Sequence, residues 1–143
     1  MTDTGLERFV LAQDSVLSSV EAELALGCKR THWMWFVFPQ LAGLGHSSMA
    51  RAYAIADLDE ARRYLAHPVL GERLRLHVGK MLSHRGRPVR DILGEPDDMK
   101  FRSCLTLFRA AASEEDRRLF DDTLGAFYGG VPDERTLGLL ATA

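Results

Sequence analysis

The sequence predicts an all-α protein in which about six to eight helices, several of them short, pack into a compact bundle with little or no sheet. Three observations support this prediction. Apolar residues recur at the three- and four-residue spacing of amphipathic helices through most of the chain, no stretch shows the sustained alternation of sheet strands, and Gly and Pro stand where helices end and begin. Because 143 residues suffice for one self-sufficient hydrophobic core, we expect residues 1–143 to form a single domain.

The N-terminal part of the chain predicts one long amphipathic helix. Its apolar residues follow helical spacing from Leu6 to Leu24, and Gly27 is a typical residue to end it. The continuous apolar run of residues 33–38 fits either a buried strand or a short buried helix by periodicity. We favour a buried helical turn.

Short elements are expected next. Residues 41–48 are rich in Gly, Ser and His and predict a loop, after which residues 48–54 can form a short helix. Asp57, with Glu60 three residues later, predicts the start of a helix that His67-Pro68 stops.

The second half of the chain reads as a succession of helices. His77 lies on the apolar face of the first of them, where we expect a core histidine, and Met99 and Phe108 are among the residues expected to be buried in the third. Prolines or an N-capping serine mark the starts of these helices, at Pro68, Pro88, Pro96, Ser113 and Pro132.

Composition narrows the classes of function. A net charge of −2 disfavours a dedicated binder of duplex nucleic acid, although Arg85, Arg87 and Arg90 form a modest basic cluster that could contact RNA. Cys28 and Cys104 lie far apart and lack metal-ligand spacing, so we expect no disulfide, no metal site and a cytoplasmic location. No apolar run is long enough to cross a membrane, and nothing in the chain calls for a cofactor.

Residues 32–40, HWMWFVFPQ, are the most unusual segment because both tryptophans stand two residues apart beside a histidine. In one interpretation Trp33 and Trp35 wall a pocket for a planar ligand, and His32 or Gln40 supplies a directed hydrogen bond. In the other interpretation the segment is core packing, which is the commoner fate of clustered aromatic residues. We favour core packing for the apolar residues and a binding role for His32 and Gln40.

A second candidate lies at the helix that begins near Pro96. Lys100 and Ser103 are three residues apart and share one helical face, and Asp97 lies three residues before Lys100. With Asp98 beside it, this set could hold an anionic or ribose-bearing ligand, Lys100 facing phosphate and a carboxylate accepting from hydroxyls. The alternative is a helix start that carries a solvated ion pair.

The loop of residues 41–51 is a third, weaker candidate. Its Gly, Ser and His residues allow close approach of the backbone to an anion, but an ordinary loop that connects two helices has the same composition. We interpret it as a loop.

The motifs resemble those of the domain-of-unknown-function family eighteen-ten over most of the chain, from about Leu6 to Leu140. They are HWMWFVFPQ at 32–40, YAI at 53–55, EA at 60–61, YLAHPVLG at 64–71, KFRS at 100–103 and TLF at 106–108. The resemblance implies a small, mainly helical bacterial protein of unassigned activity. Some members carry the name calpastatin. The sequence does not support that name, because a calpain inhibitor is expected to consist of disordered repeats, whereas this sequence predicts a compact globular domain.

The helical character and the Lys100-Phe101 helix also show a more distant resemblance to NADAR-type domains, which are associated with NAD-derived and ADP-ribosylated substrates. We therefore predict a pocket between residues 32–40 and 97–103 that binds a nucleotide or ADP-ribose type of ligand. Hydrolysis there would use Asp97 or Asp98 to position water, with Lys100 and His32 stabilising charge. The alternative is a non-enzymatic module whose exposed tryptophan segment receives a protein partner.

Overall fold

The computed structural model describes residues 4–142 of the chain. Its helices are α1 (Thr4–Asp14), α2 (Leu17–Leu26), α3 (Met34–Val37), α4 (Ser48–Ala52), α5 (Leu58–Ala66), α6 (Leu70–Leu82), α7 (Val89–Leu93), α8 (Asp97–Ala111), α9 (Glu114–Tyr128) and α10 (Glu134–Ala141). Within residues 4–142 the only β pairing is an isolated parallel bridge between Leu41 and Ile55, so the predicted all-α class is confirmed. None of these helices is long and apolar enough to cross a bilayer.

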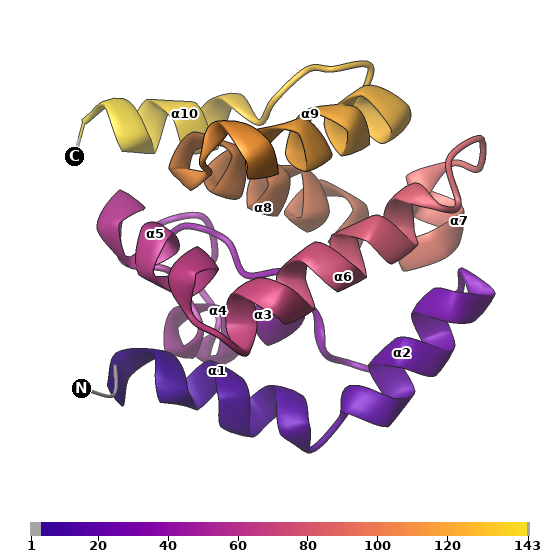
Figure 1. Cartoon of the computed structure of the whole chain (residues 1–143), viewed down its shortest axis with the longest axis horizontal. Helices are drawn as coiled ribbons and strands as arrows, with labels where there is room; N and C mark the ends of the chain where they lie inside the picture. Colours follow the sequence, from indigo (N-terminus) through magenta and orange to yellow (C-terminus); the bar gives the residue numbers. More distant parts are fainter. Residues whose placement is uncertain (1–3, 143) are drawn as a thin grey trace.

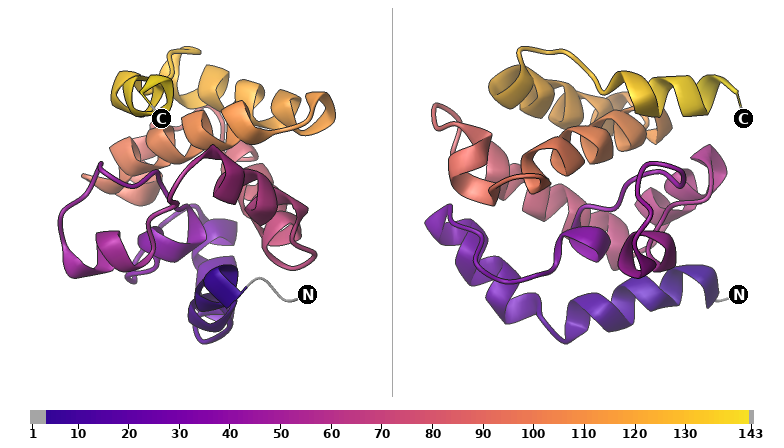
Figure 2. Two further views of the ribbon diagram at one scale, coloured as in Figure 1. Left: turned by 90° about the vertical axis from the view of Figure 1, so that its left-hand side faces the viewer. Right: turned by 180° about the vertical axis from the view of Figure 1, so that it is seen from behind.

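The helices are arranged in layers. In Figures 1 and 2, α1 and α2 lie on one face of the molecule and α8, α9 and α10 on the opposite face, with α3 to α6 between them. Helix α8 packs against α5, α7, α9 and α10, and it buries most of its circumference. Met99 is an exception to the prediction, because its side chain is 49% exposed.

Residues 4–142 form ten helices, and α3, α4 and α7 among them are single turns of four or five residues, in keeping with the prediction that several helices are short. The prediction of one continuous helix from Leu6 to Gly27 is wrong, because the chain turns at Ser15 and Val16. There the Ser15 hydroxyl donates to the Ala12 carbonyl at 2.9 Å, a local hydrogen bond of the kind that competes with helix continuation. The turn lets α1 pack against α3 while α2 packs against α6.

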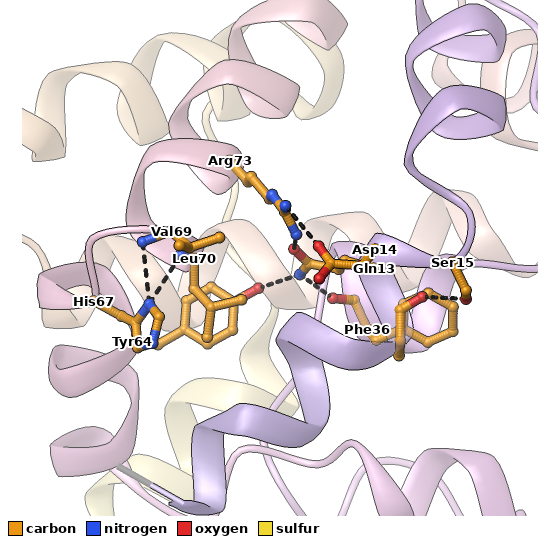
Figure 3. A network of polar contacts seen from close by, with 10 residues as sticks. Gln13, Asp14, Ser15, Phe36, Tyr64, His67, Val69, Leu70 and Arg73 are labelled. Atoms are coloured by element: carbon orange, nitrogen blue, oxygen red, sulfur yellow. Dashed lines mark hydrogen bonds and ion pairs between the residues drawn. The ribbon is translucent and has the colours of Figure 1, made fainter. Parts of the chain in front are cut away.

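A buried polar network fixes α1 against three other helices (Figure 3). The Gln13 side-chain amide donates to the Phe36 carbonyl at 2.7 Å and lies 3.0 Å from the Tyr64 hydroxyl. Arg73 donates to the Gln13 side-chain oxygen at 3.3 Å and pairs with Asp14 at 2.7 Å. Because each buried polar atom of Gln13 has a partner, the network orders α1, α3, α5 and α6 relative to one another.

His77 is buried as predicted, but its Nε2 atom has no hydrogen-bond partner among the residues described. Burial, reinforced by the positive charges of Arg73 and Lys80, lowers the pKa of His77 from 6.5 to about 4. His77 is therefore protonated near pH 6.5 in the unfolded chain but only near pH 4 in the folded chain. The free energy of unfolding consequently decreases as the pH falls from 6.5 to 4.

At pH 5 this histidine is expected to make the protein about 2 kcal/mol less stable than at pH 8. Urea denaturation at both pH values measures the difference. In His77→Leu the stability itself can change, but the dependence on pH should flatten by about this amount. An unchanged pH dependence in the variant contradicts the assignment.

Candidate functional site

A pocket of about 400 Å³ lies where α8, α10 and the chain between α3 and α4 meet. Three walls line this open pocket. The first consists of Trp35, Gln40 and the loop around Gly45, the second of one face of α8, and the third of the chain that enters α10. The volume is within the usual range for small-molecule sites.

The first wall is held by hydrogen bonds at the base of its loop. The Ala42 amide donates to the Ile55 carbonyl at 2.8 Å, and the Ile55 amide donates to the Gln40 carbonyl at 3.0 Å. Within the loop, a Cβ atom on Gly45 would lie 2.6 Å from the Cβ of Ala50, so only glycine permits this close approach. We interpreted residues 41–51 as a simple connecting loop, but in the structure this loop is ordered by hydrogen bonds and forms one wall of the pocket.

The second wall is one face of α8, as the three-residue spacing of Lys100 and Ser103 predicts. Lys100 and Ser103 both line the pocket from α8. The Lys100 ammonium lies 5.2 Å from the centre of the Trp35 ring, within the range of a cation–π contact. The pocket thus has a cation held against an aromatic face.

The third wall comes from the start of α10 and carries Asp133 and Arg135. This segment is anchored to α8, because the Asp133 amide donates to the Thr106 hydroxyl at 2.9 Å and Arg102 donates to the Val131 carbonyl at 2.8 Å. Asp133 also caps α10 by accepting from the Thr136 amide at 2.9 Å. The Arg135 side chain is exposed and forms no hydrogen bond or ion pair with any residue of the described chain.

Of the residues predicted from the sequence, the structure brings Trp35, Gln40, Lys100 and Ser103 together in this pocket. Trp35 is half-buried, as expected of a residue that forms a pocket wall. A recess of about 10 Å³ beside the pocket shares Trp35, Gln40 and Lys100 with it and is large enough for about one water molecule.

His32 and Trp33 do not line the pocket. His32 is exposed and precedes α3, whereas Trp33 is fully buried. The Trp33 indole donates to the Glu23 carboxylate at 3.1 Å, and its ring packs edge-on against Phe38 at 6.0 Å. The core-packing interpretation therefore holds for Trp33, and the expectation that His32 would face the ligand is not supported.

Asp97 and Asp98 also lie outside the lining. The Asp97 carboxylate pairs with Lys29 at 2.8 Å and lies 3.6 Å from the Lys100 ammonium. Asp98 is buried, and its backbone carbonyl accepts from the Tyr128 hydroxyl. Cys104, on the same helix, is fully buried, and burial raises the pKa of its thiol.

Sequence reasoning did not select His46, Asp133 or Arg135 as binding residues. His46 belongs to the loop whose composition has a simpler explanation. Asp133 and Arg135 follow Lys100 by 33 and 35 positions, and only the packing of α10 on α8 brings them to the pocket. No local spacing rule detects such a contact.

The basic cluster that suggested RNA is largely engaged within the molecule. Arg87 donates to the Gly27 carbonyl at 3.0 Å, and Arg90 forms an ion pair with Glu95. Two of the three arginines thus have contacts within the molecule, and contact of this cluster with RNA stays a prediction.

The model of the family described as "Protein of unknown function (DUF1810)" matches residues 3–140. The chain belongs to this family. It is also similar to the conserved hypothetical protein Rv1873 from Mycobacterium tuberculosis, whose crystal structure superposes with a TM-score of 0.93 at 48% identity, covering 96% of this chain and 97% of that one. No curated protein shows significant similarity to the chain. The DUF1810 resemblance of the sequence motifs is thereby confirmed, and neither comparison names an activity.

Proposed function

We propose that the DUF1810 pocket binds a small anionic ligand of the nucleotide or ADP-ribose type. One observation carries this proposal: Lys100 and Arg135, from two different helices, line the same pocket as the Trp35 ring. Cations of this kind recognise phosphate, and an aromatic wall suits a ligand with a planar part. The resemblance to NADAR-type domains, which are associated with NAD-derived and ADP-ribosylated substrates, favours ADP-ribose within this class.

Charge supports an anionic ligand. The side chains with formal charge in the lining are Lys100 and Arg135 against Asp133, which gives a net charge of +1. The whole chain carries −2. The pocket is thus a locally positive site on a weakly negative protein, the arrangement that attracts an anion to one place.

Hydrogen-bonding capacity supports the same class. The Gln40 amide and the His46 ring line the pocket, and neither side chain has a hydrogen-bond partner in the described structure. Together with the Lys100 and Arg135 donors they favour a ligand rich in acceptors. Asp133, the one carboxylate of the lining, can accept from a hydroxyl such as those of ribose.

The hydrolytic mechanism suggested by the sequence has no such support. It needs His32 and either Asp97 or Asp98 at the ligand, and none of the three lines the pocket. We therefore propose binding and assign no chemical step. The protein-interaction alternative needs an exposed tryptophan segment, whereas Trp33, Phe36 and Phe38 are buried in the core.

Addition of AMP or ADP-ribose is expected to raise the melting temperature of the full chain in a thermal-shift assay. At a ligand concentration of about 100 times Kd, binding to the folded state adds about 2.7 kcal/mol, which corresponds to a shift of several degrees. Lys100→Gln and Arg135→Gln should each weaken binding by about tenfold or more, because each removes a charge-assisted hydrogen bond.

Arg85→Gln is the matched control, since it removes one exposed arginine from outside the pocket. It should bind like the wild type. If neither nucleotide shifts the melting temperature at millimolar concentration, or if both pocket variants bind as tightly as Arg85→Gln, the proposal is wrong.

A further inference from the structure

Two lysines and two tryptophans meet around a single carboxylate beside the pocket. The Asp97 carboxylate lies 2.8 Å from the Lys29 ammonium through one oxygen and 3.6 Å from the Lys100 ammonium through the other. Each ammonium also lies 5.2 Å from the centre of an indole ring, Lys29 over Trp33 and Lys100 over Trp35. The set therefore runs from the core to the pocket wall.

Burial differs along this set. The side chain of Lys29 is 8% exposed, that of Asp97 16% and that of Lys100 27%. A lysine as buried as Lys29 needs a paired charge, and Asp97 provides it at hydrogen-bond distance. The separation of 3.6 Å between Asp97 and Lys100 exceeds that of a direct hydrogen bond.

The charges of Lys29, Asp97 and Lys100 leave the Lys100 ammonium available for binding an anion. One carboxylate stands between two ammonium groups, and its close contact is with Lys29. Asp97 attracts Lys100 enough to keep it on the pocket side of α8, but Lys29 has already balanced the Asp97 charge. Lys100 thus keeps its charge and its N–H donors for a ligand.

We propose that Asp97 and Lys29 are positioning residues that hold Lys100 against Trp35 without neutralising it. Neither lines the pocket, and both act through Lys100. Removing the Asp97 charge leaves two neighbouring ammonium groups that repel each other, so Lys100 moves away from the Trp35 ring. Removing the Lys29 charge lets Asp97 pair fully with Lys100, which lowers the attraction of the pocket for an anion.

The positional part can be tested without a ligand. The chain has three lysines, Lys29, Lys80 and Lys100, so reductive methylation with ¹³C-formaldehyde gives few lysine signals, and methylation retains the positive charge. In the full chain we expect the Lys100 methyl signal to be shifted upfield by the ring current of Trp35 relative to exposed Lys80. Trp35→Phe and Lys100→Gln assign the signal.

Asp97→Asn should move the Lys100 signal to the position of Lys80. Asp98→Asn is the matched control, because it removes a carboxylate from the same first turn of α8, and Asp98 forms no ion pair with Lys100 in the described chain. Both variants lose the favourable interaction of one carboxylate with the helix dipole at the N-terminus of α8, so this effect is the same in the two. If the signal stays shifted in Asp97→Asn, or moves equally in Asp98→Asn, the positioning role is overturned.

The ligand part rests on the proposed function and is tested with AMP and inorganic phosphate. Lys29→Gln, which changes no lining residue, should weaken AMP binding about tenfold, and Lys29→Arg should restore it. Equal binding by Lys29→Gln and wild type overturns the role of Lys29. Absence of AMP binding by the wild type overturns the proposed function, whereas the lysine signals still decide whether Asp97 positions Lys100.

Discussion

Replacing Gly71 by alanine is expected to lower the free energy of unfolding by about 3 kcal/mol or more, at the upper end of overpacking penalties. A Cβ atom at this position would lie 2.1 Å from the Leu65 carbonyl oxygen and 2.9 Å from its carbon. No real contact is that short. Helix α6 must therefore move away from the end of α5 to accept even one methyl group.

The Leu65 carbonyl has little freedom to move aside. It lies in the last turn of α5 and accepts a hydrogen bond from Arg75 at 3.0 Å. Arg75 in turn binds both carboxylate oxygens of Asp116, at 3.0 Å and 2.9 Å. A shift at Gly71 therefore disturbs the contacts between α5, α6 and α9 together, which is why we expect a large effect.

Gly79→Ala on the same helix is the matched control. A Cβ atom there meets nothing within 4 Å, so the substitution should stabilise the protein by about 0.5–1 kcal/mol through helix propensity. Urea denaturation of the two variants and the wild type compares them directly. Similar midpoints for Gly71→Ala and Gly79→Ala would show that α5 and α6 do not approach as closely as the structure has them.

The helix ends were predictable because their signals are local. Gly27 and Gly129 end α2 and α9 in the left-handed conformation, with φ of 70° and 63°. Asp57 and Ser113 cap α5 and α9 by accepting from the amide three residues later. Such residues act within one turn, so the sequence displays them.

Features that depend on distant contacts were not predictable. The turn at Ser15 lies inside an unbroken apolar pattern, and its advantage comes from α1 and α2 packing on different partners. Gly71 reads as an ordinary helical glycine until α5 is placed beside it. Arg135 reaches the pocket only through the packing of α10 on α8.

The candidate site shows the same division. Lys100 and Ser103 line the same pocket, and their proximity was predictable because residues three apart on a helix share one face. Trp33 and Trp35 are only two positions apart in the sequence. Trp33 directly precedes α3 and is fully buried, whereas Trp35 lies within α3 and forms a wall of the pocket. The sequence shows that the segment is unusual, but the direction of each ring depends on where α3 begins.

Replacing Glu23 by alanine is expected to cost about 3 kcal/mol of stability, because this buried carboxylate holds the chain between α2 and α3. It accepts from the Arg30 and Thr31 amides at 2.6 Å and 2.9 Å, from the Thr31 hydroxyl at 2.7 Å and from the Trp33 indole at 3.1 Å. The indole is fully buried and has no water to replace the lost acceptor. Guanidinium denaturation at pH 7 measures the loss, and Glu21→Ala, exposed on the same helix, should change stability little.

The pH dependence of stability gives a second measurement of the same carboxylate. Burial alone raises the pKa of Glu23, but the hydrogen bonds from Thr31, Arg30 and Trp33 outweigh it and lower the pKa from 4.5 to about 2. The unfolded chain thus takes up a proton near pH 4.5 that the folded chain resists until about pH 2. The stabilisation is fully present above pH 4.5 and is lost as the pH falls toward 2, a change of about 3 kcal/mol.

The side chain in Glu23→Gln cannot titrate, so this variant should lack that part of the stability loss at low pH, whereas Glu21→Gln should retain it. An equal acid loss in both variants would mean that Glu23 does not hold the segment through its charge.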